Sequence, residues 1–142
     1  MGHKADLIAY DPAKDLALIK IEWQLRYGRI SIADSKLLSS GREIGFFGSP
    51  NMLYSGVSYG KITSLDTVNQ INYISSDMNL AAGSKGGAFI NMYGEMIGIC
   101  CVVDLETGQN KAVTSNDVKG FLDSIGTQAA LKDYLAMQGQ PY

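Results

Sequence analysis

The sequence predicts an all-β fold, a small closed antiparallel barrel followed by helices at the C-terminal end. Glycine is frequent, at 16 residues, and proline is rare, at 3. Residues that favour strands are spread evenly along the chain, in short and closely spaced apolar patterns. Because six such strands fall in the middle of a 142-residue chain, one antiparallel barrel fits them better than a parallel sheet.

Composition and charge exclude several classes of protein. Apolar residues make up 46% and charged residues 18% of the chain, which excludes a disordered protein. The net charge of −2 gives no basic surface for nucleic acid or an anionic membrane. With one histidine and two adjacent cysteines, Cys100 and Cys101, we expect no metal site and no cofactor. Adjacent cysteines rarely form a disulfide, so we expect two reduced thiols on a buried strand.

The first elements are predicted from alternating apolar residues and turn signals. Residues 5–10 and 15–21 form a hairpin around a turn that contains Pro12. A short strand at residues 30–33 and a strand at residues 43–47 follow, the latter ended by a Gly-Ser-Pro-Asn turn. Residues 55–65 form a strand in which Gly56 and Gly60 predict bulges or tight bends.

The remaining strands close the barrel and lead into the helices. Strands are predicted at residues 70–75, 87–91, 95–103 and 111–114, with a hairpin turn at residues 92–94. A helix then begins at Ser115 or Asn116, either of which can cap it, and ends at Gly126. A second helix is predicted at residues 127–137, capped by Thr127.

The sharpest motif is Gly83-Ser84-Lys85-Gly86-Gly87, within SDMNLAAGSKGGAFINMYGEMIGI at residues 76–99. This stretch resembles, without a gap, the Thr-Asp-Ala … Gly-Asn-Ser-Gly-Gly-Ala-Leu … Ile-Gly-Ile segment of trypsin-like serine proteases of the HtrA/Deg type. Further stretches resemble the same family in the same order: DPAKDLALIKI at 11–21, EIGFFGSP at 43–50, SGVSYGKITSL at 55–65 and AVTSNDVKGFLD at 112–123. Their order and spacing are together specific.

The resemblance implies a chymotrypsin-type barrel and a set of site residues. Asp15 occupies the position of the acid that orients the catalytic histidine. The N–H groups of Gly83 and Lys85 would form the oxyanion hole, which stabilises the negative oxygen of the reacting carbonyl. The residues that would wall the substrate pocket, or else form a plain surface loop, are Asn79, Leu80 and Ala81. Since none of these three is charged, a small or apolar substrate side chain is favoured.

Two departures from the family pattern predict an inactive chain. Lys85 stands at the nucleophile position, where lysine cannot form the acyl-enzyme as serine does. The family's histidine lies a few tens of residues before Asp15, and the chain begins too late to contain it. His3 would sit roughly 20 Å from Asp15 at the rise of a strand, too far to replace it. Without a histidine, the expected role of Asp15 is to cap a turn.

Ser84 is the alternative nucleophile. It lies one position early, where the family has Asn or Asp. In extended backbone a shift of one residue reverses the direction of the side chain. Neighbouring side chains also point apart, so Ser84 and Lys85 do not form a catalytic pair by adjacency alone.

The length predicts an incomplete catalytic unit. Residues 1–40 form a remnant of the family's first barrel and the connection, 41–126 the C-terminal barrel with its closing helix, and 127–142 a terminal helix and tail. A lone hairpin is marginal in water. We therefore expect a complementing N-terminal segment or a homo-oligomer, and no nucleic-acid or membrane partner. The first residues lack the apolar run of a signal peptide, which predicts an intracellular location.

Two hypotheses of function follow from the residues. The first is an inactive trypsin-like module that binds a polypeptide or takes part in an assembly. The second is part of an active serine endopeptidase whose histidine comes from an upstream segment or another chain.

Overall fold

The computed structural model describes residues 3–22, 28–49 and 56–125. The chain divides into two compact units. The first unit consists of residues 1–29 and 119–142, and the second of residues 30–118. The domain boundaries predicted from the sequence, at residues 40 and 126, stay a prediction.

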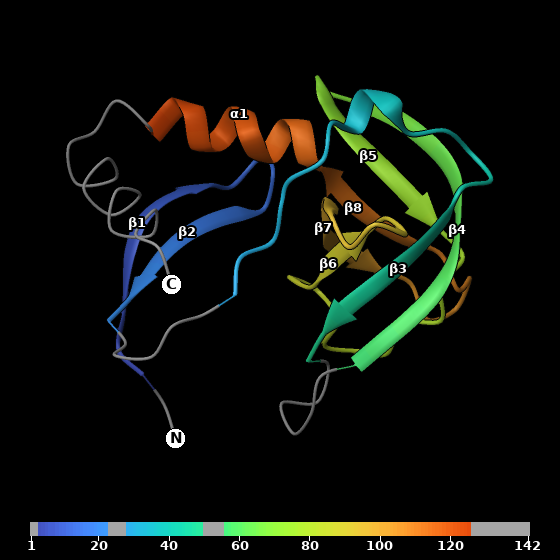
Figure 1. Ribbon diagram of the computed structural model, residues 1–142, viewed down its shortest axis with the longest axis horizontal. Helices are drawn as coiled ribbons and strands as arrows, with labels where there is room; N and C mark the ends of the chain where they lie inside the picture. Colours follow the sequence, from blue (N-terminus) through green and yellow to red (C-terminus); the bar gives the residue numbers. More distant parts are fainter. Residues whose placement is uncertain (1–2, 23–27, 50–55, 126–142) are drawn as a thin grey trace. The chain divides into compact units, whose positions relative to one another are not determined.

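The first unit contains an antiparallel hairpin of β1 (Ala5–Asp11) and β2 (Leu16–Ile21), as the sequence predicts (Figure 1). The last pair of the ladder joins Asp11 to Leu16, and a bulge interrupts the pairing between Leu7 and Ala9. Leu7 pairs directly with Ile19, and both side chains are more than half exposed. The hairpin therefore presents an apolar face as well as the open edges of a two-stranded sheet.

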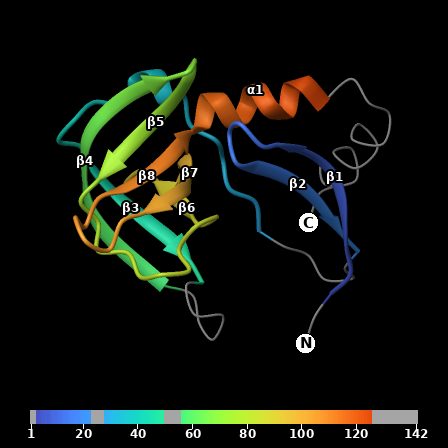
Figure 2. The same cartoon turned by 180° about the vertical axis from the view of Figure 1, so that it is seen from behind.

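The second unit is a closed antiparallel barrel, which confirms the predicted fold class (Figures 1 and 2). Its strands pair in the order β3-β4-β5-β8-β7-β6, and β6 returns to pair with β3. They are β3 (Glu43–Gly48), β4 (Gly56–Val68), β5 (Ile71–Ser76), β6 (Ala88–Ile90), β7 (Met96–Val103) and β8 (Asn110–Thr114). Each strand lies within a few residues of its predicted position.

Alternate side chains of the strands fill the barrel. Phe46 of β3 and Phe89 of β6 meet edge to face, with ring centroids 6.5 Å apart. The Phe46 ring also lies against the backbone of Gly48 and Gly87, where an added Cβ would come within 2.5 Å of ring atoms. The buried cluster consists of Ile44, Phe46, Ile62, Ile74, Met78, Leu80, Phe89, Ile97, Cys100 and Ala112.

The irregularities of β4 differ from the prediction. Gly60 pairs regularly with Ile44, and the bulge falls later, between Ile62 and Ser64. Gly60 is instead a point of close approach, because a Cβ there would lie 2.6 Å from Asp77 Oδ1. A glycine in a strand pattern indicates either a bulge or a close approach of a neighbouring segment. At Gly60 the loop after β5 requires the close approach.

The connection that precedes the barrel contains a short 3-10 helix, η1 (Ser35–Leu37), and an isolated bridge instead of the short strand expected at residues 30–33. The bridge pairs Ile32 with Met96 of β7 in parallel. It is held by hydrogen bonds from Ala33 N to Met96 O, 2.9 Å, and from Met96 N to Ser31 O, 2.8 Å.

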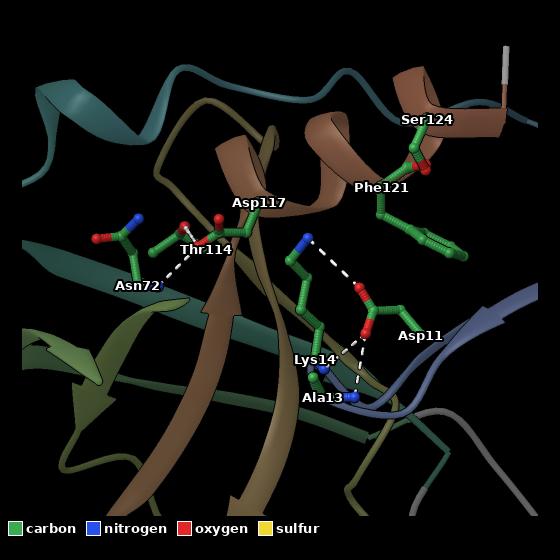
Figure 3. Close-up of polar contacts among 8 residues, drawn as sticks. All are labelled: Asp11, Ala13, Lys14, Asn72, Thr114, Asp117, Phe121 and Ser124. Carbon is green, nitrogen blue, oxygen red and sulfur yellow. Dashed lines mark hydrogen bonds and ion pairs between the residues drawn. The ribbon is translucent and has the colours of Figure 1, made fainter. Parts of the chain in front are cut away.

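The helix α1 (Ser115–Ile125) follows β8 directly. Its Asp117 carboxylate accepts hydrogen bonds from Asn72 N, 2.7 Å, and Thr114 Oγ1, 3.2 Å (Figure 3). The N–H of Asn116 donates to Ser35 Oγ, so a residue of the preceding connection supplies the cap that we expected from Ser115 or Asn116. The second predicted helix lies outside the described residues. Within residues 3–22, 28–49 and 56–125, no helix is long and apolar enough to cross a membrane.

We expect Gly98→Ala to destabilise the barrel. A Cβ at this position of β7 would lie 2.7 Å from Val113 O and 3.1 Å from the Ala112 side chain. Overpacking of this kind costs about 1–3 kcal/mol in the free energy of unfolding, measurable by urea denaturation followed by circular dichroism.

The matched control is Gly120→Ala on α1, where an added Cβ would meet nothing within 4 Å among the described residues outside its own stretch of helix. Alanine in a helix interior should raise the stability by about 0.5–1 kcal/mol. Equal effects of the two substitutions would contradict the close approach of β7 and β8.

Candidate functional site

The loop between β5 and β6 contains the Gly-Ser-Lys-Gly-Gly motif as two consecutive turns. Ser84 N donates to Ala81 O, 3.2 Å, and Gly87 N donates to Ser84 O, 3.1 Å. The third residue of each turn is a glycine with positive φ, Gly83 at 88° and Gly86 at 90°. This is the position that needs glycine in a type II turn, because side chains disfavour the left-handed region.

Two hydrogen bonds attach the second turn to β7. Gly86 N donates to Cys100 O, 2.8 Å, and Cys100 N donates to Gly87 O, 2.9 Å. On its other side Gly87 lies under the Phe46 ring, which leaves no room for a Cβ. The end of the motif is thereby fixed between the backbone of β7 and the barrel core.

The backbone N–H groups of the motif fall into two sets, those that donate within the fold and those that do not. Those of Ser84, Gly86 and Gly87 donate to carbonyls of the fold. Those of Gly83 and Lys85, the predicted oxyanion-hole donors, meet no acceptor among the residues that the structure describes. Gly83 and Lys85 are both exposed, so these two N–H groups are open to solvent or a ligand.

The side chain of Lys85 is exposed, and within the described part of the chain its ammonium forms no ion pair. Its charge acts on Cys100, a buried thiol of β7. Burial raises the pKa of Cys100 to about 11, and the charge of Lys85 opposes this shift. At neutral pH the Cys100 thiol is therefore protonated, and it offers no anion to neutralise Lys85.

Ser84 is almost fully buried, with 2% of its surface exposed. Its Oγ has no hydrogen-bond partner among the residues that the structure describes. A nucleophile must be reached by its substrate, and this hydroxyl is enclosed by the fold. The two turns explain the orientation, since they bring Lys85 to the surface and direct its neighbour inward.

Asp15 is the last residue of the turn between β1 and β2, in the first unit, and it is exposed with φ at 55°. The turn is stabilised by Asp11 and not, as expected, by Asp15. The Asp11 carboxylate accepts from Ala13 N, 3.0 Å, and Lys14 N, 3.3 Å, and pairs with Lys14 Nζ at 3.4 Å (Figure 3). The Asp15 carboxylate has no hydrogen bond or ion pair with the part of the chain that the structure describes.

The predicted pocket residues immediately precede the turns. Asn79 and Ala81 are exposed, whereas Leu80 is 5% exposed and belongs to the barrel core. Asn79 O accepts a hydrogen bond from Ser58 Oγ of β4, 3.1 Å, which holds the segment to the barrel. Side chains that could contact a ligand here are thus those of Asn79 and Ala81.

Two polar residues position this segment. Asp77 Oδ1 accepts from Lys61 N of β4, 2.7 Å, so its carboxylate has a structural role. Asn110 of β8 is 1% exposed, and its side-chain amide donates to Met78 O. Sequence reasoning missed Asn110, because nothing in the sequence around it indicates a partner 32 residues away.

Comparisons with known proteins agree with the sequence motifs. Residues 2–99 match the family model described as "Trypsin-like peptidase domain". The chain is 31% identical over 132 residues to the "Probable periplasmic serine protease do/HhoA-like" of Haemophilus influenzae, covering 86% of this chain and 28% of that protein. It is 33% identical over 135 residues to the "Periplasmic serine endoprotease DegP" of Escherichia coli K12, covering 87% and 28%. The chain thus spans less than a third of these relatives.

A solved structure shares the fold. This structure, "HtrA-type protease AlgW with decapeptide", superposes with a TM-score of 0.79 at 22% identity, covering 89% of this chain and 41% of that one.

The intracellular location expected from the sequence is wrong. Both of these relatives are named as periplasmic proteases. The expectation rested on the first residues of the sequence. Because the chain spans 28% of each relative, those residues carry no information about a leader peptide.

We expect Ser84→Ala to leave the free energy of unfolding unchanged or to raise it. A buried hydroxyl without a partner costs about 1–3 kcal/mol, and alanine removes it. The control is Ser115→Ala, because Ser115 is equally buried but its Oγ donates to Ala33 O at 2.7 Å. That substitution should lower the stability by about 1 kcal/mol. A large loss of stability from Ser84→Ala in urea denaturation would show that the hydroxyl is hydrogen-bonded after all.

Proposed function

Because the chain belongs to the trypsin-like peptidase family, we propose that it is a protease-type module, inactive as it stands, that binds polypeptide. The observation that carries the proposal is Lys85, which occupies the nucleophile position of the family motif in an exposed turn. Catalysis in this family needs a hydroxyl that histidine can deprotonate and that forms an acyl-enzyme. A lysine ammonium cannot take this role.

Ser84 does not replace the missing nucleophile. Its Oγ is enclosed, so neither a substrate carbonyl nor a general base can reach it without opening the turns. Opening would break the bond from Ser84 N to Ala81 O and the bond from Gly87 N to Ser84 O. The burial of Ser84 therefore supports inactivity independently of Lys85.

Polypeptide binding is supported by what the motif retains. The open N–H groups of Gly83 and Lys85 are the donors that would contact the carbonyl of a bound chain. The exposed Asn79 and Ala81 would line the pocket for a small or apolar side chain. The AlgW structure is that of an HtrA-type protease with a decapeptide, so a protein of this fold is known with a peptide.

Assembly is supported by the hairpin of the first unit. Leu7, Tyr10 and Ile19 are each more than half exposed, on a sheet of two strands with open edges. Such a sheet is marginal in water by itself. We propose that a complementing N-terminal segment or a second copy of the chain covers it.

The second candidate is part of an active serine endopeptidase. It is favoured by Asp15, which stands at the family's acid position with a carboxylate that has no hydrogen bond or ion pair within the described residues. In this case a histidine comes from an upstream segment or another chain, and Lys85 replaces the nucleophile of an otherwise competent site.

We expect the chain to hydrolyse casein no faster than the buffer does and to remain unlabelled by a fluorophosphonate probe. The Ser84→Ala and Lys85→Ala variants identify contamination, because a contaminating protease survives both substitutions. Hydrolysis that either substitution abolishes would contradict inactivity.

The Lys85→Ser variant distinguishes the two candidates when it is produced together with the native upstream segment. Fluorophosphonate labelling of this folded, complemented variant would support the endopeptidase. Absence of labelling would support a module that has lost the catalytic arrangement as well as the nucleophile.

A further inference from the structure

We propose that the loop at residues 83–87 binds a carboxylate of its polypeptide ligand, through the N–H groups of Gly83 and Lys85 and the Lys85 ammonium. The inference rests on the proposed binding of polypeptide. The group that the loop binds is then an anion and not the neutral carbonyl of a peptide bond.

The loop offers two backbone donors, the N–H groups of Gly83 and Lys85. The carbonyls of Ala81, Ser84 and Gly87 already accept hydrogen bonds within the fold. The one hydroxyl of the motif, Ser84 Oγ, is enclosed. The pair of N–H groups stays open, on a backbone whose successive turns resemble the concave amide arrangements that bind anions.

The positive charge of Lys85 favours a carboxylate over a neutral carbonyl as the ligand group. Within the described residues the Lys85 ammonium has no carboxylate partner, and the neighbouring Cys100 thiol is protonated at neutral pH. A carboxylate would receive hydrogen bonds from the N–H groups and pair with the ammonium. Hydrogen bonds in which the donor or the acceptor is charged are about twice as strong as neutral ones. A carbonyl would receive the N–H bonds alone.

The carboxylate can come from the C-terminus of a polypeptide or from an Asp or Glu side chain. Three N-acetylated peptides separate these sources: Ala-Ala-Ala-Val with a free carboxylate, the same peptide as its C-terminal amide, and Ala-Ala-Ala-Glu as its amide. Valine suits the small or apolar pocket expected beside Asn79 and Ala81. Binding is measured on the full chain by NMR titration, with the amide signals of Gly83 and Lys85 as the site-specific readout.

We expect at least one peptide with a carboxylate to bind about tenfold more tightly than the Val amide, a difference of about 1.4 kcal/mol. The signals of Gly83 and Lys85 should shift together. Lys85→Gln should remove the preference and Lys85→Arg should retain it. Lys36→Gln removes the same charge from an exposed residue of η1 and should leave the preference unchanged. High salt should reduce the preference.

The outcomes separate this inference from the proposed function. Equal affinities for all three peptides, with shifts at Gly83 and Lys85, would overturn the carboxylate site and leave polypeptide binding in place. Binding that shifts other signals would also overturn it. If the chain bound neither these peptides nor casein, polypeptide binding itself would be wrong. Because Lys85 is exposed, its substitutions should fold, and the unfolding transition verifies this.

Discussion

The site depends on the pair of hydrogen bonds between the Gly86–Gly87 backbone and Cys100 of β7. They fix the end of the motif to strand β7 of the barrel, and the Phe46 ring holds Gly87 from the other side. Because Gly86 and Gly87 are fixed, the chain must change direction in the residues that precede them. The two turns with Gly83 and Gly86 at positive φ are the result. The barrel thus specifies the conformation of the loop.

The same constraint decides what each residue of the motif does. The turns use the N–H groups of Ser84 and Gly87 and leave those of Gly83 and Lys85 open. They enclose the only hydroxyl of the motif and expose its only charge. A protease loop needs the open donors beside a reactive hydroxyl. Here the two N–H donors remain, and the Lys85 ammonium stands in place of the reactive hydroxyl. The donors that would stabilise the developing oxyanion of a reaction are therefore suited to bind a permanent anion such as a carboxylate.

Much of the fold could be predicted, because the barrel strands alternate apolar residues between definite turn signals, and the family motif fixes the order of the site residues. What could not be predicted depends on partners distant in sequence. A glycine at position 60 is equally compatible with a bend in the strand and with a close approach of another segment. The position of Asp77, which leaves no room for a Cβ at Gly60, shows that the second reason applies. The contact from Asn110 to Met78 O spans 32 residues. Asp11 and Asp15 both suit the hairpin turn, and the loop length that places Asp11 at its start determines which carboxylate accepts the turn N–H groups.

Amide hydrogen exchange at residues 83–87, followed by NMR on the unliganded chain, tests the fixed loop and its two open donors most directly. We predict slow exchange for Gly86 and Gly87, whose N–H groups donate to Cys100 O and Ser84 O. We predict exchange near the unprotected rate for Gly83 and Lys85, because their N–H groups are open and exposed. Protection of Gly83 and Lys85, or fast exchange of all five positions, would contradict a fixed loop that holds two donors ready for a ligand.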